Sequence, residues 1–280
     1  MLTPSDRDTL MRPENAKVNP GNHYLITGMH RSGTSLIAAL VQALGWPLGG
    51  HLLAANAGNP WGYYEDLDAV RLHARLLRTR GHSPEGFSRP SPAEIAGIPG
   101  LIGELRAYIQ ARTRQSPEGW AIKDPRATLF LPAWAASAPG VKYLLVFRHP
   151  QGVAQSLQAR WQTLRLPFDA PFSNGPANAW RLWVHYNSLI LDFYRQNAAQ
   201  CRLINVDDFQ LNQKAAIEAL GSFLGRRLPD DEVARVVQPH GLKSIAALDS
   251  NDSNRFSLPE PARELWQQLI RLARAQLTRD

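Results

Sequence analysis

Residues 23–44 read HYLITGMHRSGTSLIAALVQAL, and the expected fold of the whole chain follows from this stretch. It begins with a short apolar run at 24–26, continues through a polar segment at 28–34 that contains two glycines, and ends in a second apolar run. The apolar residues of the second run recur at helical spacing: Leu36, Ile37, Leu40, Val41 and Leu44. The pattern predicts a buried strand, a tight loop and a helix with one buried face.

The loop between this strand and this helix is suited to bind an anion. Backbone N–H groups at a helix start have no acceptor within the helix, and the helix dipole favours negative charge there. Gly28 and Gly33 have the spacing of the pattern G-x-x-x-x-G-K-[ST], but Thr34 stands where that pattern has Lys, and the cation lies inside the loop as Arg31. A guanidinium, two hydroxyls and backbone donors fit a phosphate or sulfate group held without a metal. An ordinary glycine turn is the alternative.

Three further apolar runs, at residues 120–122, 141–147 and 202–206, are short and nearly continuous, as central parallel strands are. Helical patterns separate and follow them, at residues 65–77, 92–113, 151–164, 177–194, 214–224 and 259–277. Strands that alternate with helices predict an α/β fold, with a central, mostly parallel sheet between two layers of helices. We expect residues 1–21 to form a flexible N-terminal arm and residues 22–280 to form a single domain.

Composition excludes several classes of protein. The net charge is +7 and the pI is about 9.8, but the basic residues are scattered along the sequence. We therefore expect a basic surface that attracts an anionic ligand, and we do not expect nucleic-acid binding. Cys201 is the single cysteine, which excludes an intrachain disulfide. No run is apolar enough to cross a membrane and the N-terminus lacks a signal-peptide core, so we expect a cytoplasmic protein. Asp207 and Asp208 lack a His partner, so we interpret them as structural and expect no metal. Oligomeric state is not encoded in any pattern we find.

Polar clusters follow three of the predicted strands, at residues 28–35, 123–126 and 148–156. The carboxyl ends of parallel strands lie at one edge of a sheet, where ligands bind in such folds. In the third cluster, Arg148 leaves the strand and Ser156 lies about two turns into the next helix, so both side chains are placed to contact a second anion. The three clusters together predict a site for a ligand with two anionic groups.

Two of these clusters resemble a known family. GMHRSGTS (28–35) and RHPQGVAQS (148–156) are similar to the two cofactor-binding signatures of sulfotransferases that use 3′-phosphoadenosine 5′-phosphosulfate (PAPS), and NPWGYYED (59–66) and KDPR (123–126) resemble segments of the bacterial branch. The resemblance implies the P-loop-like sulfotransferase fold and PAPS as donor, with 3′-phosphoadenosine 5′-phosphate (PAP) as product. It also implies an acceptor hydroxyl or amine on a small molecule or carbohydrate.

The same resemblance implies residue roles. The 5′-phosphosulfate would lie in the first loop, and the 3′-phosphate against Arg148 and Ser156. The cofactor-binding residues of that loop are Gly28, His30, Arg31, Ser32, Gly33, Thr34 and Ser35. This chain departs from many eukaryotic members, which have Trp at the position of Leu36 and a catalytic His at the position of Pro125, so the adenine contact and the general base stay open.

Sulfuryl transfer is an in-line displacement, and by analogy with phosphoryl transfer we expect positioning and charge stabilisation to dominate its catalysis. Arg31 and Lys123 are expected to stabilise charge on the leaving phosphate. Glu65 is our first candidate for the base, because GYYE resembles relatives in which a Glu after the first helix has this role. Its alternative is an ordinary acid in the first turn of a helix. Asp124 is the second candidate, and His30 and His51 follow.

Aromatic residues near Glu65 would form a wall for the acceptor, or else a small satellite core: Trp46, Trp61, Tyr63 and Tyr64.

Two other functions stay open. A P-loop kinase would require a cation in place of Thr34 and a magnesium ligand, and a non-catalytic protein that binds nucleotides or polyanions would keep the loops without the chemistry.

Overall fold

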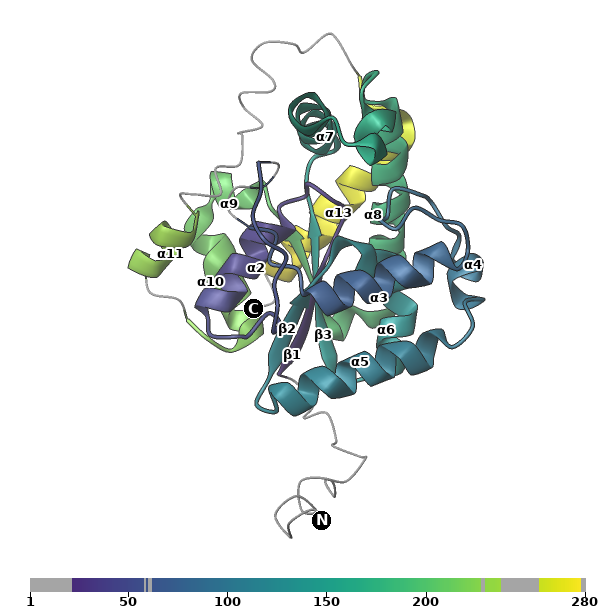
Figure 1. Cartoon of the computed structure of the whole chain (residues 1–280). Coiled ribbons are helices and arrows are strands. Elements are labelled where there is room, and N and C mark those ends of the chain that lie inside the picture. The colour runs from purple at the N-terminus through teal and green to yellow at the C-terminus, as the bar shows by residue number, and fades with distance from the viewer. Residues whose placement is uncertain (1–21, 58, 60–61, 228–229, 238–256, 278–280) are drawn as a thin grey trace.

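The computed structural model describes residues 22–57, 59, 62–227, 230–237 and 257–277, so the expected arm at 1–21 lies outside the described residues. In the part that is described, four parallel strands form one sheet in the order β2-β1-β3-β4 (Figure 1). They are β1 His23–Thr27, β2 Trp120–Lys123, β3 Val141–Phe147 and β4 Cys201–Asn205. The predicted parallel α/β sheet is therefore confirmed.

Helices cover both faces of the sheet (Figure 1). One face carries α2 (Thr34–Ala43), α9 (Asp208–Leu211), α10 (Gln213–Leu224) and α11 (Asp230–Val237). The remaining elements are α3 Leu67–Arg78, α4 Pro92–Ala96, α5 Leu101–Gln115, α6 Leu131–Ser137, α7 Pro150–Leu164, α8 Ala177–Asn197 and α13 Glu260–Leu277, with the 3₁₀ helices η1 Pro125–Phe130, η2 Pro167–Phe172 and η3 Ala198–Gln200. None of the described helices is long and apolar enough to span a membrane.

The strands are apolar on both faces because both faces are covered. In β3, Tyr143, Leu145 and Phe147 belong to one buried cluster while Leu144 and Val146 belong to the other, as the alternation of side chains along a strand requires. The clusters lie on opposite faces of the sheet, which gives the three layers that the sequence pattern predicts.

Two helix boundaries differ from the sequence prediction. The helix expected at 92–113 is two helices, because α4 ends at Gly97 and α5 starts after Gly100, whose φ of 72° is left-handed. Ser91 and Glu94 form the reciprocal capping box at the start of α4. The helix expected from Glu65 begins at Leu67, after the N-cap Asp66, whose carboxylate accepts a hydrogen bond from Asp68 N. The interpretation of Glu65 as a first-turn acid is therefore wrong.

The outer edge of β4 is closed by one side chain. Gln276 of α13 accepts a hydrogen bond from Leu203 N (2.9 Å) and donates one to Cys201 O (2.8 Å). Its amide thus satisfies backbone groups that a neighbouring strand would otherwise pair with. Cys201 is buried, and burial raises the pKa of its thiol to about 12, as suits an unreactive structural cysteine.

We predict that Gln276→Ala lowers the free energy of unfolding by about 1–3 kcal/mol, because two backbone groups lose their partner. Urea denaturation of both proteins measures the difference. Gln268→Ala is the matched control on α13, since Gln268 makes one hydrogen bond to an exposed Arg195, and it should cost well under 1 kcal/mol. Equal losses in the two variants would contradict an edge-closing role for Gln276.

Candidate active site

The loop after β1 depends on two glycines. A Cβ on Gly28 would lie 2.0 Å from the carbonyl oxygen of Val146, so the loop passes over β3 only without a side chain at this position. Gly33 is the N-cap of α2 with a left-handed φ of 85°, and its Cβ would meet Val206 Cγ2 at 2.7 Å. Between them, Arg31 also has a left-handed φ, of 66°, which is uncommon for a residue with a side chain. The strand, tight loop and helix that the sequence predicted are therefore present, and anion binding by the loop stays a prediction.

Donors gather at the start of α2. Ser32 N donates to Met29 O (3.1 Å), which closes the turn. Leu36 N and Ile37 N both donate to Gly33 O, so Thr34 and Ser35 supply the N–H groups that lie before the first bonded position of the helix. The first turn of α2 carries no acidic residue, and Ser32 Oγ is buried without a hydrogen-bond partner among the described residues. A buried hydroxyl without a partner beside a helix N-terminus is suited to an anion.

The loop after β1 and the helix after β3 meet at one hydrogen bond. Arg31 Nε donates to Ser156 Oγ at 2.9 Å, across 125 positions of sequence. The sheet order explains the contact, because β1 and β3 are neighbours and both run toward the same edge. The structure thus brings together two residues that the sequence analysis placed in different anion sites.

Arg148 is held from two sides at the end of β3. Its Nε donates to Asp207 Oδ1 (3.2 Å), and the backbone N–H of His149 donates to Asp207 Oδ2 (2.9 Å). Trp183 Nε1 donates to the carbonyl oxygen of Arg148 (2.9 Å). Asp207 is buried and has a structural role, as the sequence indicates. The role is specific: its carboxylate orients the guanidinium group of Arg148, the residue that the sequence assigned to the second anion.

The cluster at residues 123–126 brings Lys123 to Glu65. Lys123 Nζ donates to Glu65 Oε1 (2.7 Å) and to Tyr63 O (3.0 Å), and Arg126 Nη1 donates to Glu65 Oε2 (3.2 Å). The Lys123 and Glu65 side chains are 3% and 5% exposed, so this pair is shielded from water. Two of the four predicted catalytic residues therefore lie together, although each oxygen of Glu65 already has a cationic partner.

Asp124 lies behind this pair. Its Oδ1 accepts hydrogen bonds from the backbone N and from Nη1 of Arg126, both at 2.9 Å, and its Oδ2 lies 2.9 Å from Nδ1 of His73. Trp134 Nε1 donates to His73 Nε2 (3.0 Å), so Nδ1 of this histidine carries the hydrogen that Asp124 accepts. Burial opposes ionisation, but the Arg126 charge and the His73 contact overcome it and hold the pKa of Asp124 well below its usual range. Asp124 is an anion with both oxygens occupied.

His30 faces the aromatic side of the site. Its ring packs edge-to-face on Phe87 (4.8 Å between centroids) and lies 6.3 Å from Tyr186, and no described residue forms a hydrogen bond with its buried Nε2. Burial and the charges of Arg126 and Arg160 hold the pKa of His30 well below 6.5, so the imidazole is neutral. His51, the other candidate histidine, is exposed.

Positive charges are crowded around Arg31. Burial, followed by the nearby charges of Arg160 and Arg148, lowers its pKa to about 10. Arg160 lies one turn after Ser156 on α7 and pairs with the buried Asp169. Arg160 was not among the residues predicted from the sequence; the signal that points to it is the four-residue spacing from Ser156, which puts both side chains on one helix face. Crowded guanidinium groups favour a bound polyanion.

The expected aromatic wall is only partly present. Trp46 belongs to the buried core, where it packs on Tyr24 (5.2 Å between centroids) and under Arg226 (3.9 Å), so the satellite-core alternative holds for it. Trp61 lies outside the described residues. Tyr63 donates from its hydroxyl to Asn56 Oδ1 (2.8 Å) near the loop. Phe87, not singled out from the sequence, is the aromatic residue that contacts His30.

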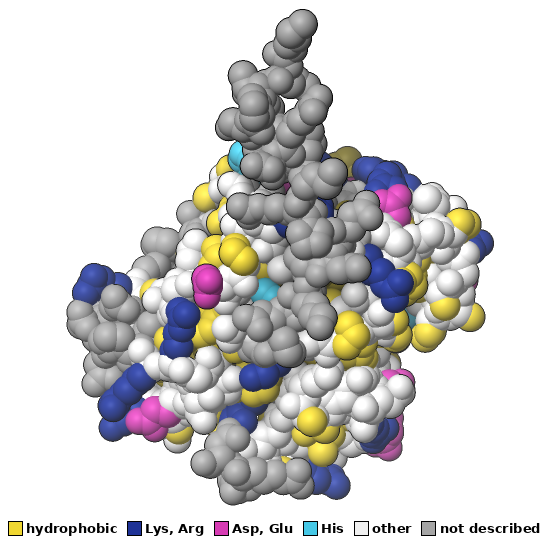
Figure 2. All heavy atoms as spheres, turned by 90° about the horizontal axis from the view of Figure 1, so that it is seen from below, with side chains coloured by type: hydrophobic (Ala, Val, Ile, Leu, Met, Phe, Trp, Pro, Cys, Tyr) yellow, Lys and Arg dark blue, Asp and Glu magenta, His cyan; other side chains and the backbone are white. Residues whose placement is uncertain are grey.

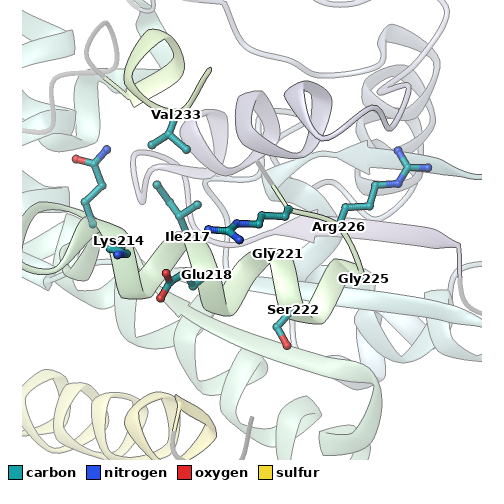
Figure 3. Close-up of a pocket in the computed structure, with 10 residues that line it drawn as sticks. Lys214, Ile217, Glu218, Gly221, Ser222, Gly225, Arg226 and Val233 are labelled. Atoms are coloured by element: carbon teal, nitrogen blue, oxygen red, sulfur yellow. The ribbon is translucent and has the colours of Figure 1, made fainter. Parts of the chain in front are cut away.

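Other surface features do not join this site. A groove of about 790 Å³ between α10 and α11 is lined by Lys214, Glu218, Arg226 and Val233, among others, and by no residue of the three polar clusters (Figure 3). On the face seen in Figure 2, Lys and Arg side chains are scattered and form no continuous block. Among the described residues, no group of three or more His, Cys, Asp or Glu could hold a metal ion.

Comparison with known proteins gives one family. The model described as "Sulfotransferase family" matches residues 24–230. No curated protein sequence matches the chain significantly. Three solved structures show similar folds. The sulfotransferase domain from the curacin biosynthetic pathway is 18% identical and covers 91% of this chain and 99% of its own (TM-score 0.57). The sulfotransferase domain from the Synechococcus PCC 7002 olefin synthase is 19% identical and covers 93% of this chain and 98% of its own (TM-score 0.57). Sulfotransferase STF1 from Mycobacterium tuberculosis H37Rv is 17% identical and covers 95% of this chain and 80% of its own (TM-score 0.50).

We predict that His30 makes stability fall in acid. Its lowered folded pKa means that below about pH 6.5 the unfolded chain binds a proton that the folded protein does not, so the free energy of unfolding decreases as pH falls through that value. Between pH 7.5 and 5.5, His30→Gln should remove up to about 1.4 kcal/mol of this decrease. Urea titrations at both pH values measure it, and the exposed His51→Gln is the control. A variant that keeps the full wild-type slope would contradict a neutral, buried His30.

Proposed function

Since the chain belongs to the sulfotransferase family, we propose that it moves the sulfuryl group of PAPS to a hydroxyl group, or an amine, of a small-molecule or carbohydrate acceptor. The observation that carries the choice of donor is the hydrogen bond between Arg31 and Ser156, which joins two anion-binding elements into one site. PAPS has anionic groups at both ends of its ribose, and a site with two linked cationic centres fits it. A cytoplasmic location stays a prediction from the sequence.

The residues present fit this donor. Ser32 Oγ is a buried hydroxyl without a partner in the described part of the chain, and the first turn of α2 offers N–H groups. The pKa of Arg31 is lowered by burial and by other guanidinium groups, a cost that an anion relieves. The 5′-phosphosulfate would be held by the loop from Gly28 to Ser35, including His30, Gly33 and Thr34. The 3′-phosphate would be held by Arg148 and Ser156.

The donor supplies an activated sulfuryl group with a nucleotide phosphate as leaving group. In our proposal, Arg31 and Lys123 bind and neutralise charge on the phosphate side, where such donors are worth most because the site is buried. Glu65 is the proposed proton acceptor, and Arg126 holds it in place through Oε2. Asp124 has both oxygens occupied, so we assign it to the support of Arg126.

The kinase alternative has no support in this geometry. Thr34 stands at the helix start where a kinase of this type has its Lys, and Lys123 arrives from β2 instead. A non-catalytic binder of nucleotides or polyanions has the same donor site and differs only in turnover. Separate measurements of binding and of transfer therefore distinguish it from an enzyme.

We predict that PAP raises the melting temperature of the protein and that ATP does so much less. At 100 times its dissociation constant, PAP should stabilise the folded state by about 2.7 kcal/mol. Ser156→Ala and Arg148→Gln should reduce the shift, because each removes a contact proposed for the 3′-phosphate, while Arg71→Gln, at an exposed ion pair, should not. Equal shifts with PAP and ATP, or none with either, would refute PAPS as the donor.

We also predict that Arg31→Ala reduces the rate of sulfate transfer by about 10²–10³-fold, the usual effect of removing one charge-stabilising donor. The measurement is transfer of ³⁵S from labelled PAPS to a panel of phenols, alcohols, amines and sugars. Arg31→Lys should keep part of the rate, because it keeps the positive charge but loses the planar set of hydrogen-bond donors of the guanidinium group. PAP binding without transfer to any acceptor of the panel would favour the non-catalytic binder.

A further inference from the structure

The site contains a buried chain of polar contacts that the proposed chemistry uses only at one end. It begins in the core and ends beside the anion loop, and each contact is 2.7–3.2 Å long. In order, its members are Trp134, His73, Asp124, Arg126, Glu65 and Lys123. Their charges alternate from Asp124 onward. Arg126 lies between the carboxylates of Asp124 and Glu65, and Lys123 ends the chain at Glu65.

The two cations on Glu65 differ in how firmly they are held. Arg126 donates to Glu65, to Asp124 and, through Nε, to Pro84 O (2.9 Å), and its backbone N–H also binds Asp124. Lys123 has Glu65 and one carbonyl oxygen, Tyr63 O, and its ammonium sits on a flexible four-carbon stem. Lys123 is therefore the partner that can leave while Arg126 keeps Glu65 in place.

Lys123 is already next to the anion loop. Ser35 Oγ, in the first turn of α2, donates to the same carbonyl oxygen as Lys123 Nζ, that of Tyr63 (3.4 Å and 3.0 Å). In the sheet, Lys123 lies opposite Ile26, two residues before the loop begins at Gly28. An anion bound at the start of α2 and the Glu65 carboxylate therefore compete for one ammonium group.

We propose that Lys123 changes partners when the donor binds: it pairs with Glu65 in the free protein and with the anion of the nucleotide in the complex. Arg126 then acts as a positioning residue that retains Glu65 through Oε2 while Oε1 becomes free to accept a hydrogen bond from the acceptor. Glu65 is thus blocked until the donor is in place. This inference rests on the proposed function, because it takes a PAPS-type nucleotide as the incoming anion.

The exchange makes a prediction that a fixed ion pair does not. Glu65→Gln removes the resident competitor for Lys123, so PAP should bind about fivefold or more tighter than to the wild-type protein, a coupling typical of linked sites. Lys123→Met should weaken binding about tenfold or more. In the Lys123→Met background, Glu65→Gln should bring no gain, because no ammonium remains to be released. Isothermal titration calorimetry with PAP measures all four dissociation constants.

The double variant separates exchange from general electrostatics. If Glu65→Gln tightens binding equally with and without Lys123, the loss of one negative charge explains the gain and the exchange is refuted. Unchanged or weaker binding to a folded Glu65→Gln protein also refutes it. The control is Glu104→Gln, which removes the exposed partner of Arg75 and should leave PAP affinity unchanged.

A structure of the wild-type protein with PAP decides the matter if Glu65→Gln does not fold. Separation of Lys123 Nζ from Glu65 Oε1 beyond about 4 Å supports the exchange, and a retained pair overturns it. Failure of the wild-type protein to bind PAP at all is a different result. It would refute the proposed donor, and with it the premise of the exchange.

Discussion

The close approach of the chain at Gly28 to the carbonyl of Val146 is the constraint on which the site depends. A single added carbon would lie 2.0 Å from that oxygen, so any side chain at position 28 would push the loop away from β3. Because the loop lies close against the end of β3, the Arg31 side chain reaches Ser156 on the helix that follows β3. The sheet order places β1 and β3 side by side, and the glycine lets the loop after β1 meet the helix after β3 at the Arg31–Ser156 hydrogen bond. Arg148 and Lys123 lie at the ends of β3 and β2, the two strands that flank β1.

Local patterns predicted the fold well because the strands are short, apolar and followed by helices of clear periodicity. They also predicted the strand, tight loop and helix at residues 23–44, while anion binding by that loop stays a prediction. They failed where partners are distant: Arg148 meets Asp207 59 positions away, and Arg126 meets Glu65 61 positions away. No periodicity encodes such pairs. The break between α4 and α5 was within reach, since the Pro99-Gly100 dipeptide is a turn signal.

Several features of this site lower the free energy of unfolding of the protein. Arg31 and Tyr64 both have left-handed backbone, which costs on the order of 1 kcal/mol each without glycine. Arg31 is itself a proposed catalytic group, and Tyr64 directly precedes another, Glu65. The pKa of Arg31 is lowered by burial and by two other guanidinium groups, and Ser32 and His30 keep buried polar atoms that no described residue satisfies. Strain, like-charge repulsion and unsatisfied groups coincide where a ligand would relieve them. The surrounding apolar clusters on both sheet faces hold the site in this state.

Gln276 has a consequence for the order in which the chain can fold. The four described strands are complete once β4 has been made, but the outer edge of β4 is closed by α13, which follows much later in the sequence. During synthesis, the sheet therefore exists for a time with an open strand edge, the kind of surface that pairs with other chains. We expect a nascent chain that stalls before α13 to present that edge to its neighbours, because Gln276 is then absent from Leu203 N and Cys201 O.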